Sequence, residues 1–447
     1  MISRTILAIL AVWFFVSAGA ALSAESAGKT APAPWTLATA IKEALAQSPD
    51  ARIAEERVAA ARAMLTQAAA ADWPQLSLKS SYMQSNNPMM AFGAILGQRA
   101  FTPTIDFNRP GEVDNFNLTA MVGYNIYSGG RASAGKAAAQ AGAEAAARER
   151  EAALAQLETE VARAYCQIGQ SREGVRAIEA AVAAYEESLR VAKLRHASGQ
   201  LLKSELLNIE AQLAQTREQL LSLRHNAALA EKYFLVLLGH DSSETVTLDA
   251  SASSAGLVPP PGDVTIAARP ELQAMQSRVA AAENAVRVAR GGLLPTVNAF
   301  ASYQYDQGWR LNGDSRSWTA GVQAEIPIFD GQLTRGRIAE AEANEAQARQ
   351  GLRKLELALG LQLDQARLAL KLAREQLAAT ETLVAQANES ARMSRERFAA
   401  GALLSAELIG VETRLTEARM RRAVAQAAEK IAVADLRRAA GLPLLGN

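Results

Sequence analysis

The stretch NIYSGGRASAGKAAAQ, residues 125–140, passes from a strand-like alternation into a helical pattern, and PIFDGQLTRGRIAEAE, residues 327–342, does the same 202 positions later. Three glycines have counterparts at this distance: Gly129, Gly199 and Gly239 match Gly331, Gly401 and Gly441. The differences 331−129, 401−199 and 441−239 all equal 202. A spacing kept without a gap over three pairs predicts an internally duplicated chain.

Apolar residues with heptad-like spacing predict two very long helices. The first stripe contains Leu157, Val161, Ile168, Val175, Val182 and Leu189, and the second contains Leu359, Leu363, Leu370, Leu377, Val384 and Ala391. The patterns run to about Ala197 and Ala399, which corresponds to roughly 100 Å of helix at 1.5 Å per residue. After a glycine turn, each chain segment returns as a helix. We also expect helices at residues 36–71 and 264–292, each stacked end to end with a returning helix.

Four runs alternate between apolar and polar side chains and predict amphipathic strands. They lie at residues 76–82, 116–126, 297–305 and 318–326. A length of roughly ten residues suits a tilted strand that crosses a bilayer, and a soluble four-stranded sheet is the alternative. In lipid an open sheet leaves backbone groups without partners, and bacterial barrels begin at about eight strands. If these strands face lipid, several chains must therefore share one barrel.

The N-terminus has the three-part layout of a secretory signal, namely Arg4, an apolar run at 6–16 and small residues at 17–24. A buried N-terminal helix is the alternative. The expected organisation is a signal peptide at 1–24, a first repeat at 35–240, a linker rich in serine and proline at 241–263, and a second repeat at 264–442.

Composition and spacing argue against several functional classes. Lys and Arg number 47 against 46 Asp and Glu, so a net charge of +1 offers no basic surface for nucleic acid. Residues 130–136 have the spacing of a phosphate-binding loop, but Ala137 lacks the hydroxyl that Mg²⁺ requires. The three histidines have no ligand spacing with one another or with Cys166, which we interpret as a small buried residue. No catalytic triad can be grouped either, and we expect neither enzymatic activity nor a cofactor or metal site.

The ordered set of a secretory signal, paired strand hairpins, two helical rods per repeat and a glycine turn at the far end resembles the TolC-like outer-membrane efflux proteins. Residues 125–130 and 327–331 resemble that family's junction between strand and helix. The resemblance implies an α+β, mostly α fold with internal duplication. Long antiparallel helical hairpins would form an α-helical barrel, and four strands per chain would contribute to a trimeric transmembrane β-barrel.

The same resemblance implies a location and a set of partners. The chain would form a homotrimer that sits in the lipid of the outer membrane and extends into the periplasm. The tips of its hairpins would form a gated entrance that docks on a periplasmic adaptor (membrane fusion) protein and an inner-membrane pump.

The family often has an acidic residue six positions after the tip glycine, where it rings the entrance. Gly199 and Gly401 are the tip glycines here, so the resemblance points to Glu205 and Glu407. Three copies of such carboxylates would favour cations at the mouth, whereas a solvated helix face is the alternative for either residue. A second acid sometimes follows three residues later, but this chain has Asn208 and Gly410 there.

Four leucines lie beside the tips and have two possible roles. They either contact the adaptor or form the first core positions of the returning helices: Leu201, Leu202, Leu403 and Leu404.

These observations predict a passive outer-membrane channel for efflux or secretion. The alternative is an exported periplasmic coiled-coil scaffold or adaptor without a pore, which would explain the heptads but not the strands. Between Pro74 and Gly129 the first repeat is longer than the second by 221−202 = 19 residues, because Pro74 and its counterpart Pro295 are 221 positions apart. The loop with Asn87 in this excess either binds something outside the cell or plugs or folds over the barrel mouth.

Overall fold

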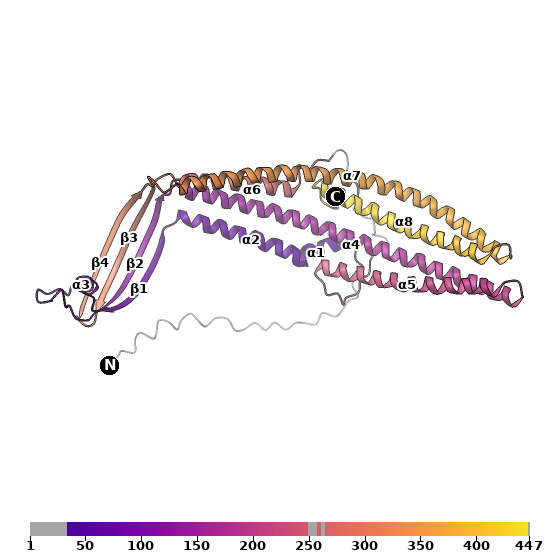
Figure 1. Cartoon of the computed structure of the whole chain (residues 1–447), viewed down its shortest axis with the longest axis horizontal. Helices are drawn as coiled ribbons and strands as arrows, with labels where there is room; N and C mark the ends of the chain where they lie inside the picture. Colours follow the sequence, from indigo (N-terminus) through magenta and orange to yellow (C-terminus); the bar gives the residue numbers. More distant parts are fainter. Residues whose placement is uncertain (1–33, 249–256, 261–263, 446–447) are drawn as a thin grey trace. The chain divides into compact units, whose positions relative to one another are not determined.

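A computed structural model describes residues 34–248, 257–260 and 264–445, and the residues from Trp35 onward form one structural unit. The predicted signal peptide and residues 249–256 and 261–263 of the predicted linker lie outside the described residues. The elements in chain order are α1 Leu37–Gln47, α2 Pro49–Ala69, the 3₁₀ turn η1 Ala70–Asp72, β1 Gln75–Ser85, α3 Pro88–Gly97, β2 Val113–Tyr127, α4 Arg131–Ala197, α5 Lys203–Leu238, α6 Pro270–Gly291, β3 Thr296–Gly308, β4 Gly313–Glu325, α7 Leu333–Ala399 and α8 Ser405–Ala439. The predicted α+β, mostly α fold class is confirmed (Figure 1).

The four strands form one antiparallel sheet in the order β1-β2-β3-β4. Consecutive strands are therefore neighbours, and β1 and β4 are the two edges. Each edge strand has a neighbour on one side only within the described sheet, so its outer backbone groups are available for pairing with another chain.

The register gives the sheet one polar and one apolar face. Asn117 pairs with Ser81 on one side and with Asp306 on the other, and Asp306 pairs with Ser315, so these four residues share a face. The opposite face carries Leu76, Leu78, Phe116, Leu118, Tyr303, Tyr305, Trp318 and Val322. Much of this apolar face is bare, since Leu76 is 79% exposed and Trp318 76%.

The two long helices α4 and α7 have 67 residues each and begin 202 positions apart, because 333−131 = 202. Both end where the heptad-like patterns predicted, at Ala197 and Ala399. Each then turns and returns, as α5 and α8. Within the described part of the chain, no helix combines the length and the apolar character that crossing a bilayer requires.

The expected helix at residues 36–71 is wrong in one respect, because it is interrupted between α1 and α2. Ser48 precedes Pro49 and adopts an extended conformation, with φ −58° and ψ 133°. Proline disfavours a helical conformation in the residue before it and is well suited to the first position of a new helix. The expected helix at 264–292 is shortened for the same reason, because Arg269 is extended before Pro270 and α6 begins there.

The returning helices meet these proline junctions end to end, as expected. α5 ends at Gly239, which has φ +85°, and a Cβ there would lie 2.7 Å from the carbonyl oxygen of Gln47. α8 ends in the same manner near Gly441, where a Cβ would lie 2.8 Å from the carbonyl carbon of Ala268. Only glycine allows both the left-handed turn and this approach of two backbones.

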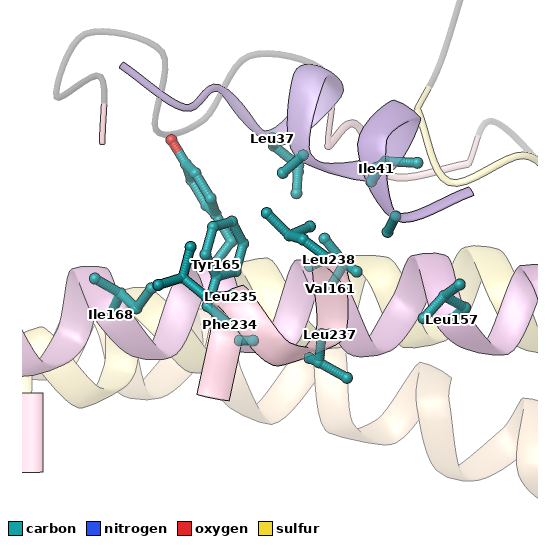
Figure 2. Close-up of a cluster of buried hydrophobic side chains, with 14 of the residues drawn as sticks. Leu37, Ile41, Leu157, Val161, Tyr165, Ile168, Phe234, Leu235, Leu237 and Leu238 are labelled. Carbon is teal, nitrogen blue, oxygen red and sulfur yellow. The ribbon is translucent and has the colours of Figure 1, made fainter. Parts of the chain in front are cut away.

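The largest core cluster lies beside the first of these junctions. Figure 2 shows side chains from α1, α4 and α5 converging there, with Phe234 and Leu238 fully buried and Tyr165 nearly so. Trp35 packs edge-on against the ring of Phe234 with the centroids 6.4 Å apart. This cluster holds the first short helix against the long rod.

The 19-residue excess contains a helix where the sequence predicts a loop. α3 follows β1 at the end of the strands away from the long helices (Figure 1). Asn87 caps it through its side chain, which accepts from the backbone N–H of Met89 at 3.0 Å, and Pro88 occupies its first position. These two local signals explain why a helix begins in the predicted loop.

Candidate functional site at the hairpin tips

The tip turns of the two helical hairpins lie at the end of the rods opposite the sheet (Figure 1) and have the same backbone geometry. Gly199 and Gly401 adopt φ +74° and +83°. In the first tip the N–H of Gln200 donates to the carbonyl of Arg195 at 2.8 Å, and in the second the N–H of Ala402 donates to that of Arg397 at 2.8 Å. Both turns are Schellman motifs, in which a left-handed residue closes the last helical turn and reverses the chain.

Arg195 joins the two tips to each other. Its guanidinium donates to the carbonyl of Phe398, near the end of α7, at 2.8 Å and to that of Gln200 in its own turn at 3.3 Å. The same group lies 5.3 Å from the centre of the Phe398 ring. A cation at a helix C-terminus also interacts favourably with the helix dipole. Arg195 therefore connects α4, its turn and α7.

The tips also share one small apolar core. Its buried members come from both hairpins and are Ala192, Leu201, Ile209, Phe398 and Leu408. Further from the tip, the Tyr185 hydroxyl on α4 donates to the carbonyl of Ile409 on α8 at 3.3 Å and lies 3.2 Å from the hydroxyl of Thr413. Burial raises the pKa of Tyr185, so its hydroxyl stays a donor at neutral pH.

An ion pair whose carboxylate is buried lies inside the second hairpin, about two turns from its tip. Arg395 on α7 donates to both carboxylate oxygens of Glu412 on α8, from Nε at 2.5 Å and from Nη2 at 2.8 Å. The Glu412 side chain is 2% exposed. These bonds raise the pKa of Arg395 above its usual range.

Of these contacts, only the pair of Arg395 and Glu412 has a signal in the sequence. Glu412 stands four residues after Leu408 and three before Leu415, both buried, so it is a charge within an apolar stripe. A charge in such a position predicts a buried partner. Nothing in the sequence marks the carbonyl of Phe398 as the acceptor for Arg195.

The structure separates the four leucines that were candidates for docking. Leu201 belongs to the shared core and Leu403 packs partly against it. Leu202 and Leu404 are 71% and 59% exposed and directly precede α5 and α8. Leu201 and Leu403 therefore have the geometry of core positions. Leu202 and Leu404 present exposed apolar side chains at the tips, as a contact with an adaptor would require.

The two predicted entrance carboxylates lie in equivalent places. Glu205 is in the first turn of α5 and Glu407 in the first turn of α8, where a negative charge interacts favourably with the helix dipole. Glu205 is half-buried and Glu407 is exposed. Neither forms an ion pair with another described residue of the chain. Their charges are therefore not neutralised by a neighbouring cation in the described parts of this chain.

The described ranges have no assembled metal-ion site, and their cysteine is buried. They contain no group of three histidine, cysteine, aspartate or glutamate side chains placed to hold a metal ion. Cys166 is buried on α4, and burial raises the pKa of its thiol to about 11. At neutral pH such a thiol is protonated and a poor nucleophile or ligand.

Comparison with known proteins gives concordant matches. The family described as outer membrane efflux protein matches residues 40–240 and 263–442. Protein CyaE of Bordetella pertussis is 27% identical over 273 residues, which is 58% of this chain and 54% of that protein. Nodulation protein T of Rhizobium leguminosarum bv. trifolii is 21% identical over 424 residues, covering 91% of this chain and 87% of that protein. The match to CyaE thus spans about half the length of that relative.

A solved structure extends the likeness to the whole fold. The crystal structure of the outer membrane protein VceC of Vibrio cholerae superimposes with a TM-score of 0.76, at 21% sequence identity. The superposition covers 91% of this chain and 96% of that chain. At this identity the likeness concerns the arrangement of helices and strands.

Proposed function

Because the chain belongs to the outer membrane efflux protein family, we propose that it is a passive outer-membrane channel that serves as the exit duct of a tripartite efflux or secretion system. The observation that carries this proposal is the bare apolar face of an open four-stranded sheet. Soluble proteins rarely expose a contiguous apolar surface of this kind. A lipid bilayer covers such a face without any further protein.

The ends of the strands support a position across the bilayer. Tyr82 and Trp309 pack together, with ring centroids 5.9 Å apart, at the outer end of the apolar face. Trp73, Tyr127 and Phe329 are exposed at the inner end, where the helices begin. Aromatic side chains concentrate at the two interfaces of a membrane. The shortest strand, β1 with 11 residues, rises about 28 Å along a barrel axis at a tilt near 40°, close to the thickness of a bilayer core.

The two open edges support assembly from several copies. Backbone groups in lipid need partners, so β4 of one chain must pair with β1 of another. The four strands alternate in direction, and such a junction is therefore antiparallel like those within the chain. Closure needs at least two copies by strand count. We propose three, as the resemblance to TolC-like proteins implies, which gives a twelve-stranded barrel and a twelve-rod helical tunnel.

Localisation and assembly test this proposal directly. The mature chain should fractionate with the outer membrane, require detergent for extraction and run as a trimer that resists heating in mild detergent. A water-soluble monomer or dimer would overturn the channel and favour a periplasmic coiled-coil scaffold without a pore.

We propose that Glu205 and Glu407 ring the periplasmic entrance. Both are first-turn carboxylates without a cationic partner in the described chain, at the tips of the two hairpins. Replacing both with glutamine removes the charge and keeps the shape. The reversal potential of reconstituted channels in a salt gradient should then shift towards lower cation selectivity.

A matched control lies one turn along α5. Asn208 is exposed and uncharged, so Asn208→Ala should leave the reversal potential unchanged. If the glutamine variants behave like this control, the assignment of the two carboxylates to the entrance is wrong.

We propose that the adaptor docks on the tips through Leu202 and Leu404. Their exposed side chains lie beside the turns that include Gly199 and Gly401, whereas Leu201 is buried in the shared core and Leu403 packs partly against it. Leu202→Ser combined with Leu404→Ser should weaken co-purification of a periplasmic adaptor with the trimer, together with its inner-membrane pump. Co-purification that is undiminished, with the trimer intact, would exclude these leucines as contacts.

A further inference from the structure

The helix α3 is fixed to one particular face of the sheet. Its buried side is formed by Ala91, Ala94 and Ile95, which pack with Val113 of β2. After its last turn, Gln98 is buried and donates from Nε2 to the Asn115 side chain at 2.9 Å. Val113 and Asn115 lie on the polar face of the sheet, together with Asn117 and Asp306.

The hairpin between β3 and β4 packs closely against the end of this helix and the residues that follow it. A Cβ at Gly308 would lie within van der Waals overlap of the Gln98 amide, and one at Gly313 would lie 2.9 Å from the Cβ of Ala100. The hydroxyl of Ser315 donates to the carbonyl of Gly97. Three strands thus contribute to the seat of α3, all from the polar face.

The polar face becomes the inner wall when the apolar face meets lipid. The inference therefore rests on the proposed channel function, and it places α3 inside the barrel at its outer mouth, at the end of the strands away from the helices (Figure 1). A helix in this position is surrounded by the aqueous lumen on every side that the sheet does not cover.

The side of α3 that faces away from the sheet is apolar. The helix PMMAFGAILG contains no polar side chain. Met89 is 81% exposed, Met90 48% and Leu96 50%, and two phenylalanines of the following segment, Phe101 and Phe107, stack on each other and are also exposed. We refer to these five residues as the α3 patch. Water is a poor environment for such a surface, so a further apolar partner is expected.

The width of a twelve-stranded barrel indicates that the partner of each patch is the same patch on the other copies. Twelve strands spaced about 4.8 Å apart and tilted by about 40° enclose a backbone cylinder roughly 24 Å across. A helix with its side chains is about 10 Å thick, so three such helices in mutual contact already need a circle of roughly 22 Å, and the inward side chains of the wall leave less than the full backbone diameter. Three copies of α3 lying against the wall thus meet at the barrel axis.

We propose that the α3 patches of three copies of this chain contact one another and close the outer mouth of the channel. The occupant of each patch is the same patch on the neighbouring copies. The contact between copies is apolar, and the channel would open at this end when the three helices separate. This closure lies at the opposite end of the molecule from the hairpin tips.

Cysteine cross-linking tests the contact between copies. In a Cys166→Ser background, Leu96→Cys and, separately, Met89→Cys should give a covalent dimer band after treatment of the native trimer with a short bismaleimide. Leu78→Cys is the matched control, because Leu78 is 71% exposed but lies on the outer, lipid-facing side of the barrel. It should give no such band.

Single-channel conductance tests the closure. Met89→Asp combined with Leu96→Asp puts six carboxylates into the contact, and their mutual repulsion should raise conductance roughly twofold or more. Asn87→Asp is the control, since aspartate caps a helix as well as asparagine and adds charge outside the patch. It should leave conductance near that of the unmodified channel.

The outcomes separate the two proposals. A heat-resistant trimer in which neither position 89 nor position 96 cross-links, with unchanged conductance in the double aspartate variant, would overturn the closure and leave the channel standing. A chain that forms no membrane trimer at all would overturn the proposed function, and the closure with it.

Discussion

Replacing Arg395 with alanine leaves a charge buried inside the second hairpin. Arg395 binds both carboxylate oxygens of Glu412, and the two side chains differ in their access to water. Glu412 is 2% exposed, whereas Arg395 is 44% exposed. Loss of the arginine therefore leaves the carboxylate without solvent, but loss of the carboxylate leaves a guanidinium that water can reach.

The magnitudes follow from this asymmetry. Removing one partner of a buried ion pair typically costs about 3–5 kcal/mol. We expect Arg395→Ala to lie at the lower end, at about 3 kcal/mol, because Arg419 is also close enough for its charge to interact with Glu412. Glu412→Gln keeps the shape of the side chain and should cost only about 1 kcal/mol. The double variant buries no unpaired charge and should be more stable than Arg395→Ala alone.

Amide hydrogen exchange of the α7 and α8 peptides near this tip measures the local opening free energy. Where opening is at equilibrium, 3 kcal/mol corresponds to exchange about 150-fold faster and 1 kcal/mol to exchange about fivefold faster. Peptides from the sheet serve as an internal control and should exchange at the same rate in all variants.

Two results would refute the reasoning about Arg395 and Glu412. One is an effect of Glu412→Gln on the opening free energy as large as that of Arg395→Ala. It would show that leaving the arginine without its carboxylate costs as much as leaving the carboxylate without its arginine. The other is a double variant that opens more readily than Arg395→Ala, which would show that the buried carboxylate is not the source of the cost.

Three further predictions concern single side chains. Gly239→Ala should destabilise the chain more than Gly199→Ala in urea unfolding, by about 1 kcal/mol or more, because both glycines have positive φ but only the first lies against another backbone; equal losses would contradict the close approach. Phe398→Ala should cost about 3–5 kcal/mol of local stability at the tips, measured by proteolysis there, while the exposed Leu404→Ala should change stability by less than about 0.5 kcal/mol. Cys166, whose pKa is raised to about 11, should resist iodoacetamide at pH 8 until the protein unfolds, and rapid alkylation of the native protein would count against its burial.

The long helices could be predicted to within about three residues at each end, because their signals are local and repeated. The apolar stripe fixes the face of each rod, and a glycine that must adopt positive φ ends it, as at Gly199 and Gly401. The strands were predictable for the same reason, since a period of two residues over a whole strand specifies both its existence and its faces. The predicted faces agree with the register that pairs Asn117 with Asp306.

The errors lie where one or two residues decide the conformation. The break at Ser48 depends on a single following proline, and the continuous polar and apolar pattern on either side concealed it. α3 has only ten residues, all apolar, glycine or proline, so it has no amphipathic period to detect. The pair Asn87-Pro88 is a helix-start signal, but it is equally typical of a turn, so the sequence alone does not distinguish the two.

The tip contacts were beyond prediction for a different reason. The bond from Arg195 to the carbonyl of Phe398 joins residues 203 positions apart, and a backbone acceptor has no sequence signature. The same holds for Tyr185 and Thr413, which are 228 positions apart. Only the packing of one hairpin against the other brings these groups together.

The two open edges of the sheet have a consequence for the dominance of mutations. In the proposed trimer each chain supplies one edge strand to each neighbour. A single copy with a defective β1 or β4 therefore prevents closure of the whole barrel. When normal and defective copies are made in equal amounts and mix at random, only about one ring in eight contains three normal copies, as follows for a closed assembly of three. An edge-strand mutation should therefore be dominant over a normal allele, whereas a mutation that prevents export of the chain should be recessive.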